Sequence, residues 1–464
     1  MTEEKKYLKW YNKLGYGAGD LASNCSYGLV SSFVLIYLTN TVGLNAGIIG
    51  TLMMVSKLLD GVTDVFFGTI IDRTKSKMGK ARPWMLFSQI GVSIMMVLLF
   101  TIPDMGQNMQ YVYFFITYTL MNAVFYTASN IAYSSLVSLT TKNSNERVQL
   151  GSIRFIFSLL TNLVVASVTV SLTTALGGGA AGWKAVAIIY AVIALVVNTI
   201  SVLSVKELPE SELVERTETG EVKPQQKTKL VDGVKILIAN KYYLIILAIY
   251  VLYYGMMGVT QTVGIYYMTY VLGKASLLGT FTLATLFPMI IVLSITPVLV
   301  KKFKGIYKVI NVGYDGAIIF RGLFLIFAFM GNMPLMLLTL FLNGICTGPL
   351  VGSLNALIAS SSDYTTHTKG VRLDGMMYSC SSFGIKVGSG VGTALAGWLL
   401  AAGGYDGQAA VQAASAVTMI KVSYAVVPFV VVIGMKLLVK ALKVEKANEK
   451  WDAEHETQNN RDRD

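Results

Sequence analysis

Long stretches of apolar and small residues recur twelve times along the 464-residue chain. A helix of about 20 such residues crosses the hydrocarbon core of a bilayer. The composition agrees, since 54% of the residues are hydrophobic and only 14% are charged. The chain is therefore predicted to be an all-α membrane protein with twelve transmembrane helices. Their approximate positions are 14–40, 46–71, 84–103, 110–139, 151–176, 184–204, 241–271, 277–300, 309–330, 333–359, 372–402 and 414–440.

One polar stretch divides these spans into two groups of six. It contains KELPESELVERTETGEVKPQQKTKLVDGVK, which has the length and composition of a linker. The predicted organisation is an N-terminal six-helix bundle (1–205), a cytoplasmic central loop (206–240), a C-terminal six-helix bundle (241–441) and a cytoplasmic polar tail (442–464). A short basic turn follows the second span of each half, as expected for two parallel repeats.

Lysine and arginine collect in alternate loops, and the loops between them carry almost no positive charge. This asymmetry predicts that both termini and the central loop are cytoplasmic. The net charge of +12 therefore sets the topology in a lipid bilayer, and no nucleic-acid partner is expected. No cleavable signal peptide is expected either, because the first span is too long and lacks a cleavage site.

The second span carries three ionisable groups in SKLLDGVTDVFFG, where hydrocarbon would be the expected neighbour. Lys57, Asp60 and Asp64 share one helical face. Each charge costs about 2.5–3.5 kcal/mol near the centre of a membrane helix. The stripe must therefore face other helices or water. An ion pair between Lys57 and one aspartate could hold helices together. The second aspartate would then lack a partner, and a bound cation or proton would neutralise it.

A monovalent cation fits this stripe in two ways. The Asp60 and Asp64 carboxylates, with the hydroxyls of Thr63 and Thr127, supply the hard oxygen ligands that would suit Na⁺ as the bound metal. A close carboxylate pair can equally carry H⁺. The residues leave the choice of ion open. Elsewhere, neither a histidine relay nor a cysteine-based metal site or disulfide is expected.

Further polar side chains at membrane depth suit a ligand rich in hydroxyls, because such a ligand needs carboxylates, amides, cations and aromatic faces. Salt bridges between helices would equally explain the charged members, and bundle packing would explain the tyrosines. Asn130 could simply bond a neighbouring backbone. The candidate substrate-binding residues are Asp20, Asn24, Tyr27, Tyr126, Asn130, Arg154 and Lys386.

The basic loop RTKSKMGKARPW follows the second span. Arg73, Lys80 and Arg82 are predicted to form a cytoplasmic clamp at the helix ends that breaks and reforms during gating. The alternative is that these charges only set the topology.

Several motifs occur together in one order: LGYGAGDLASN, KLLDGVTDVFFGTIIDRTKSKMGKARPW, YTASNIAYSSL, ERVQLGSIRF, SDYTTHTKGVRLDG and SSFGIKVGSGVG. In this the chain resembles the glycoside–pentoside–hexuronide:cation symporters. The resemblance implies the major facilitator fold, two six-helix bundles around a central cavity. It also implies cation-site roles for Asp60, Asp64 and Thr127, sugar contacts for Asp20 and Arg154, and a place for Lys386 between the two sites.

Two departures from a melibiose-type member narrow the substrate. Asn130 replaces an acidic sugar ligand and Ser134 replaces a tryptophan, which argues against α-galactosides. Thr63 stands where that member has an amide, so sodium use is left open. A pentoside, a hexuronide such as a glucuronide, or a β-glucoside is expected instead.

The function predicted from these features is Na⁺- or H⁺-coupled symport of a small glycoside into the cell by alternating access. The transporter is expected to be no enzyme, to need no cofactor, to lie in the cell membrane and to work as a monomer. The alternatives are a proton-coupled exporter of the same fold, a membrane-embedded transferase and a sugar sensor. The exporter is disfavoured by the polar residues at membrane depth, the transferase by short loops without catalytic groups, and the sensor by the lack of a signalling domain.

Overall fold

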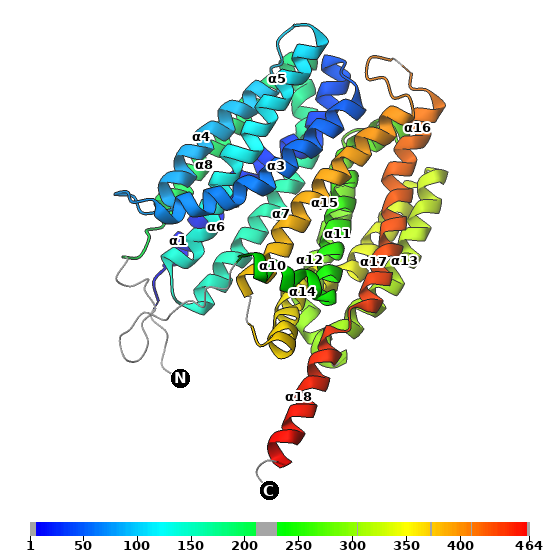
Figure 1. The fold of residues 1–464 in the computed structure, drawn as a ribbon. Coiled ribbons are helices and arrows are strands. Elements are labelled where there is room, and N and C mark those ends of the chain that lie inside the picture. Colours follow the sequence, from blue (N-terminus) through cyan, green and yellow to red (C-terminus); the bar gives the residue numbers. More distant parts are fainter. Residues whose placement is uncertain (1–5, 210–229, 304, 372–373, 410, 462–464) are drawn as a thin grey trace. The chain divides into compact units, whose positions relative to one another are not determined.

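In the computed structural model, the elements of regular structure are helices (Figure 1). The structure describes residues 6–209, 230–303, 305–371, 374–409 and 411–461. In chain order the first elements, with η marking a π-helical segment, are α1 (Trp10–Gly17), α2 (Gly19–Ile36), η1 (Tyr37–Val42), α3 (Ala46–Arg73), α4 (Arg82–Leu99), α5 (Gln107–Thr119), η2 (Leu120–Tyr126), α6 (Thr127–Thr140), α7 (Ser144–Ala175) and α8 (Gly179–Ser204). They are followed by α10 (Leu230–Ala239), α11 (Lys241–Tyr266), η3 (Tyr267–Val271), α12 (Leu277–Phe303), α13 (Ile306–Met330), α14 (Met333–Lys369), α15 (Asp374–Ala402), α16 (Ala414–Lys421), η4 (Val422–Val426), α17 (Val427–Ala441) and α18 (Val444–Arg461).

Among the described residues, eleven helices are long and apolar enough to cross a membrane. The predicted fourth span, 110–139, corresponds to the uninterrupted run of α5, η2 and α6. Its many tyrosine, threonine and asparagine residues make this run less apolar than the other spans. The structure confirms the all-α membrane fold and is consistent with twelve spans.

The chain divides into two compact units. The first contains residues 1–225, 261–280 and 393–419, and the second contains residues 226–260, 281–392 and 420–464. The first unit therefore includes the last part of α11 and of α15 as well as the helices of the N-terminal half. The division into two six-helix bundles at 1–205 and 241–441 stays a prediction.

Helix boundaries differ from the sequence prediction in several places. Part of the central loop is helical (α10), and so is most of the predicted polar tail (α18). The predicted spans 333–359 and 372–402 leave the DYTTHTKG segment between them, but α14 continues through this segment to Lys369. Polar residues do not stop a helix where it leaves the bilayer, so hydropathy marks the membrane boundary and not the helix end.

Glutamates stabilise the starts of two helices in the same way. Glu207, which follows α8, accepts the backbone N–H groups of Lys80, Ala81 and Arg82 at 2.7, 2.9 and 3.0 Å, at the start of α4. In the second unit, Glu445 accepts two backbone N–H groups at the start of α13, at 3.1 and 2.8 Å. A carboxylate there satisfies donors that the helix leaves free and complements the helix dipole. Both glutamates follow the last span of a predicted half.

The ends of α2 and α11 form a second repeated feature, because both have the same local structure. The π-helical segments YLTNTV (η1) and YMTYV (η3) each lead to a glycine in the left-handed region, Gly43 at φ 84° and Gly273 at φ 70°. Such φ values favour glycine. The matching segments support a parallel repeat, and the sequence analysis did not detect this one.

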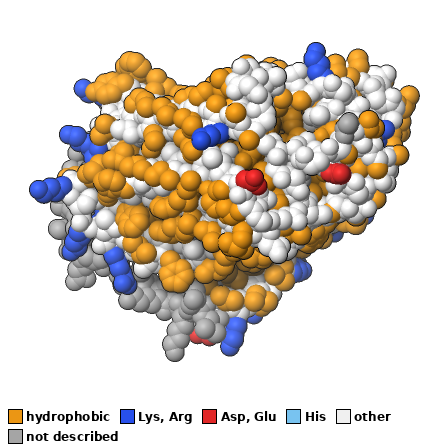
Figure 2. Space-filling view, turned by 90° about the horizontal axis from the view of Figure 1, so that it is seen from above, with side chains coloured by type: hydrophobic (Ala, Val, Ile, Leu, Met, Phe, Trp, Pro, Cys, Tyr) orange, Lys and Arg blue, Asp and Glu red, His pale blue; other side chains and the backbone are white. Residues whose placement is uncertain are grey.

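Hydrophobic side chains cover much of the surface that is visible in Figure 2. On α4, the side chains of Phe87, Ile90 and Ile94 are 63%, 44% and 52% exposed. These residues share one helix face. Exposed apolar faces of this kind are expected to contact lipid.

Candidate functional site

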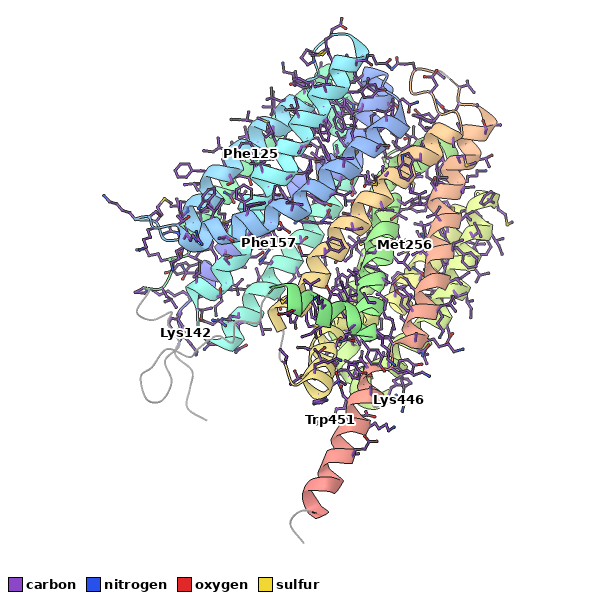
Figure 3. All side chains as sticks on the ribbon, viewed as in Figure 1. Phe125, Lys142, Phe157, Met256, Lys446 and Trp451 are labelled. Atoms are coloured by element: carbon purple, nitrogen blue, oxygen red, sulfur yellow. The ribbon has the colours of Figure 1, made fainter. Side chains whose placement is uncertain are left out.

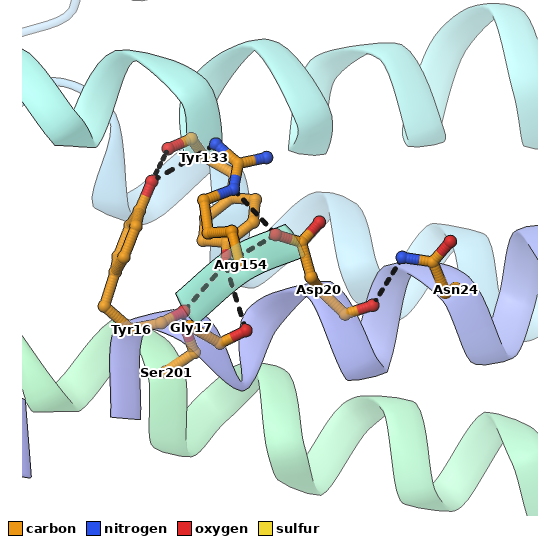
Figure 4. A network of polar contacts seen from close by, with 7 residues as sticks. All are labelled: Tyr16, Gly17, Asp20, Asn24, Tyr133, Arg154 and Ser201. Carbon is orange, nitrogen blue, oxygen red and sulfur yellow. Dashed lines mark hydrogen bonds and ion pairs between the residues drawn. The ribbon is translucent and has the colours of Figure 1, made fainter. Parts of the chain in front are cut away.

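An ion pair between α2 and α7 lies at the centre of the polar network in Figure 4. The Arg154 Nε atom is 2.7 Å from Asp20 Oδ2. The guanidinium lies 4.0 Å from the ring centroid of Tyr133 on α6, and the Tyr133 hydroxyl is 3.4 Å from the same carboxylate oxygen. The side chains of Arg154 and Asp20 are 20% and 14% exposed. The pair is therefore mostly buried, and a small part of each side chain stays exposed.

The surrounding residues fix the position of this pair. Tyr16 and Tyr133 each donate a hydroxyl hydrogen bond to the other's backbone carbonyl, both at 2.7 Å. Ser201 on α8 donates to the same Tyr16 carbonyl at 2.9 Å. A Cβ atom on Gly19 would lie 2.9 Å from the Tyr133 ring, so only glycine allows this approach. The Asp20–Arg154 pair thus sits on a rigid support from four helices.

Two amides extend the polar face. Asn24 donates to the Asp20 backbone carbonyl at 2.8 Å, and Asn162 on α7 donates to Asn24 Oδ1 at 3.0 Å. Both side chains are half-buried. The sequence analysis did not select Asn162. The available signal was an amide on the same span as Arg154, eight residues further along.

A second cluster contains the lysine of the charged stripe. The Lys57 ammonium is 3.1 Å from the Tyr27 hydroxyl and 4.6 Å from the centroid of its ring. The Tyr27 ring stacks on Tyr126, with centroids 5.5 Å apart and planes at 26°. Lys57 is only 7% exposed. The predicted substrate residue Tyr27 thus contacts both Tyr126 and the lysine.

The candidate cation residues lie on the next turn of α3 and on α6. The Thr127 hydroxyl hydrogen-bonds the Asp60 carboxylate and also lies 2.9 Å from the Asn122 carbonyl. Asp60 is 8% exposed and Thr127 3%. Thr63 donates its hydroxyl to the Asp60 main-chain carbonyl at 3.1 Å, within its own helix. Asp64, four residues beyond Asp60, is half-buried.

Two predicted substrate residues remain, Asn130 and Lys386. Asn130 on α6 is exposed. Lys386 belongs to α15 in the second unit, where its side chain is half-buried. The glycines around it let α15 approach α11 closely: a Cβ atom on Gly388 would lie 2.5 Å from the carbonyl oxygen of Val251. This contact agrees with KVGSGVG being a packing segment.

The predicted gating residues surround the loop between α3 and α4. Arg73 is exposed at the end of α3. The Arg82 guanidinium donates to the carbonyl of Val202 on α8 at 3.0 Å and to that of Met78 at 3.3 Å. The Lys80 backbone is held by Glu207. Within the first unit, these bonds connect the loop to the end of α8.

A further polar cluster, which the sequence analysis did not predict, joins η1 to η3 and to the segment after α15. The Asn40 amide donates to the Tyr270 hydroxyl at 2.6 Å, and Asn40 Oδ1 accepts from Tyr405 at 2.7 Å. The two phenol oxygens are 2.9 Å apart. Asn40 and Tyr270 occupy matching positions of the repeated π-helical segments. All three residues lie in the first unit.

In the part of the chain that the structure describes, polar and charged side chains thus gather between the helices of the first unit. The same fold occurs in a solved nucleoside transporter, with a TM-score of 0.63 and 13% identity, over 92% of this chain and 98% of that one. At this identity the likeness concerns the fold alone.

The family follows from the sequence comparisons. The family model for MFS/sugar transport proteins matches residues 15–446, and the chain belongs to this family. An isoprimeverose transporter of Lactiplantibacillus pentosus is 31% identical over 97% of this chain and 92% of its own length. A putative glycoside/cation symporter of Escherichia coli (strain K12) is 30% identical over 95% and 93%. These findings confirm the resemblance drawn from the motifs, and the protein is a transporter and not an enzyme.

Proposed function

We propose that this transporter imports a small glycoside together with a monovalent cation. The observation that carries the proposal is that two polar clusters lie in the first unit. Asp20 and Arg154 provide charged hydrogen-bonding groups beside aromatic rings, whereas Asp60 and Thr127 provide a buried carboxylate and hydroxyl. The names of the relatives, an isoprimeverose transporter and a putative glycoside/cation symporter, support the substrate class.

The sugar site uses the chemistry that hydroxyl groups require. Asp20 accepts hydrogen bonds, Arg154 donates them, and Asn24 can do both. The rings of Tyr27 and Tyr126 offer apolar faces to the C–H surface of a sugar ring. Asn130 extends the set with an amide, and we propose that Lys386 joins it from α15. A pentoside, a glucuronide or a β-glucoside remains the proposed substrate.

The cation site is proposed at Asp60 and Asp64. The Asp60 carboxylate, the Thr127 hydroxyl and the Asn122 carbonyl are hard oxygen ligands of the kind that Na⁺ requires. Thr63 lies beside them on α3. Protonation of the same carboxylate would make the coupling ion H⁺.

Lys57 provides a physical link between the two sites. It stands one turn before Asp60 on α3, and its ammonium contacts Tyr27, which stacks on Tyr126. A cation that neutralises Asp60 changes the field at Lys57, and Lys57 in turn sets the position of the tyrosine pair. Sugar and cation would then bind with reciprocal cooperativity. Alternating access, with gates at Arg73, Lys80 and Arg82 on the proposed cytoplasmic side, would convert this linkage into transport.

Proteoliposomes provide the test. Na⁺ and H⁺ gradients are imposed separately while uptake of labelled isoprimeverose, a β-glucoside, a pentoside and a glucuronide is measured. We expect one gradient to drive accumulation of at least one sugar, and Asp60→Asn to abolish the accumulation while Asp104→Asn, at an exposed loop position, preserves it. Uptake by the wild type that ignores both gradients would refute coupling. Export of preloaded sugar against its gradient would reverse the proposed direction.

A further inference from the structure

Two adjoining cavities open on the loop side of α3 and α4, and all their lining residues belong to the first unit. The apolar cavity has a volume of about 430 Å³ and is lined chiefly by Phe67, Pro83, Trp84, Phe87, Val124 and Phe125. The basic cavity has a volume of about 590 Å³. Thr74 and Ser76 line both. An apolar and a basic compartment therefore share one edge.

Part of the wall of the apolar cavity belongs to the apolar face of α4, which is expected to contact lipid. Phe87, one of its walls, is 63% exposed and continues the apolar face of α4. Phe125, labelled in Figure 3, comes from the η2 segment across the cavity. The walls thus come from three helical runs. A cavity of this composition at a lipid-facing surface suits a hydrocarbon chain.

The basic cavity concentrates positive charge at the membrane boundary. Its lining includes five basic residues, Lys75, Lys77, Lys80, Arg82 and Lys206, and one acidic residue, Glu207. The Glu207 carboxylate already accepts three backbone N–H groups at the start of α4. Lys75, Lys77 and Lys206 are exposed. The cavity therefore offers a net positive field to an anion.

Trp84 lines the apolar cavity and contacts Thr74, which lines both cavities. Its indole N–H donates to the Thr74 hydroxyl at 2.7 Å, and its ring packs edge-on against Phe67 at 6.0 Å between centroids. Tryptophan prefers this boundary, because one part of the ring is apolar and the N–H is polar. The boundary between headgroup and acyl chain would fall beside Trp84.

We propose that this double cavity binds an anionic phospholipid. One acyl chain lies between Phe67, Phe87 and Phe125, and the phosphate of the headgroup is held by Lys75, Lys77 and Lys206. Charge complementarity selects an anionic lipid over a zwitterionic one, since basic clusters at the membrane boundary attract anionic headgroups. A free phosphate would leave the apolar compartment unfilled, so the lipid accounts for both halves of the site.

Brominated lipids can test this, because bromine quenches a tryptophan that it touches. The full-length transporter is placed in nanodiscs of phosphatidylcholine that contain a small fraction of acyl-brominated phosphatidylglycerol or acyl-brominated phosphatidylcholine. We expect the anionic lipid to quench more at equal content, and the difference to disappear in Trp84→Phe. Replacing Lys75, Lys77 and Lys206 by glutamine should lower the preference for the anionic lipid roughly tenfold or more.

A matched variant replaces Lys301, Lys302 and Lys308 by glutamine in a basic segment of the second unit, and should keep the preference. Circular dichroism and the elution volume of each variant verify folding. Equal quenching by both lipids in the wild type would overturn the proposal. So would an anionic preference that survives the lysine replacements at 75, 77 and 206. Inorganic phosphate could also abolish the preference for the anionic lipid, so that the two brominated lipids quench equally at every lipid content. That result would overturn the lipid proposal and assign a site for a soluble anion.

Discussion

The Asp20–Arg154 pair permits a test that separates a structural from a sugar-binding role. We consider Asp20→Asn, Arg154→Gln and the double variant. Breaking a buried ion pair costs about 3–5 kcal/mol and breaking an exposed pair less than about 1 kcal/mol. With exposures of 14% and 20%, each single replacement should destabilise the fold by about 2–3 kcal/mol. The double variant should be more stable than either single one, because no buried charge is left alone.

Transport should respond differently. If both side chains bond sugar hydroxyls, each replacement removes a charged hydrogen bond worth about 1.5–3 kcal/mol, which weakens binding roughly 10- to 150-fold. The double variant should then transport no better than the single ones. Thermal unfolding in detergent reports the first effect, and proteoliposome uptake over a range of sugar concentrations reports the second.

The exposed pair Lys450–Glu454 on α18 supplies the control, since its side chains are 78% and 61% exposed. Replacing both by glutamine should change neither stability nor uptake. If the double variant at 20 and 154 regained wild-type uptake along with stability, the pair would be only a lock between α2 and α7. The proposed sugar site would then lose its charged centre.

Three further predictions concern the other networks. In Asp60→Asn, the apparent sugar affinity measured by equilibrium binding should no longer depend on Na⁺ or on pH. If the dependence remained, the cation site would have to lie elsewhere. Glu207→Ala removes the acceptor for three backbone N–H groups and should lower the free energy of unfolding by about 1–3 kcal/mol. A lower thermal midpoint of unfolding would show this loss, and an unchanged midpoint would contradict the capping role. Asn40→Ala should remove the hydrogen bonds of Asn40 to Tyr270 and Tyr405. A cysteine placed at the buried Met268 of η3 should then react faster with a membrane-impermeant maleimide. Equal labelling with and without Asn40→Ala would show that the cluster does not control access.

Much of the fold was predictable because hydropathy reports the bilayer directly. The helices agree with the predicted spans in place to within the length of a few turns, and the eleven apolar helices among the described residues are consistent with twelve spans. The largest differences lie where helices extend beyond the membrane, as α14 does to Lys369 and α7 does back to Ser144. Those extensions are held by local hydrogen bonds and packing, which leave no mark in hydropathy.

The candidate site residues could be chosen from the sequence, and their roles stay a prediction, but their contacts could not be foreseen. Helical periodicity places Asp20 and Asn24 one turn apart on one face of the first span, yet it could not say that Arg154 would pair with Asp20. Asn162 was missed because one amide in an apolar span carries no pattern. The Asn40 cluster was missed because its three residues come from distant segments, and their encounter depends on tertiary packing.

The π-helical ends of α2 and α11 have a mechanical consequence. A π segment holds one residue more than the α-helix on either side of it can accommodate. If that residue were absorbed into regular α-helix, everything beyond it would turn by about 100° around the helix axis, because a turn holds 3.6 residues. The side chains of Asn40 and Tyr270 would then rotate away from each other and lose their hydrogen bond. The parts of α2 and α11 that precede the π segments would stay in place. A change of helical register within a single turn would thus be enough to break the hydrogen bonds that connect η1 to η3 and to Tyr405.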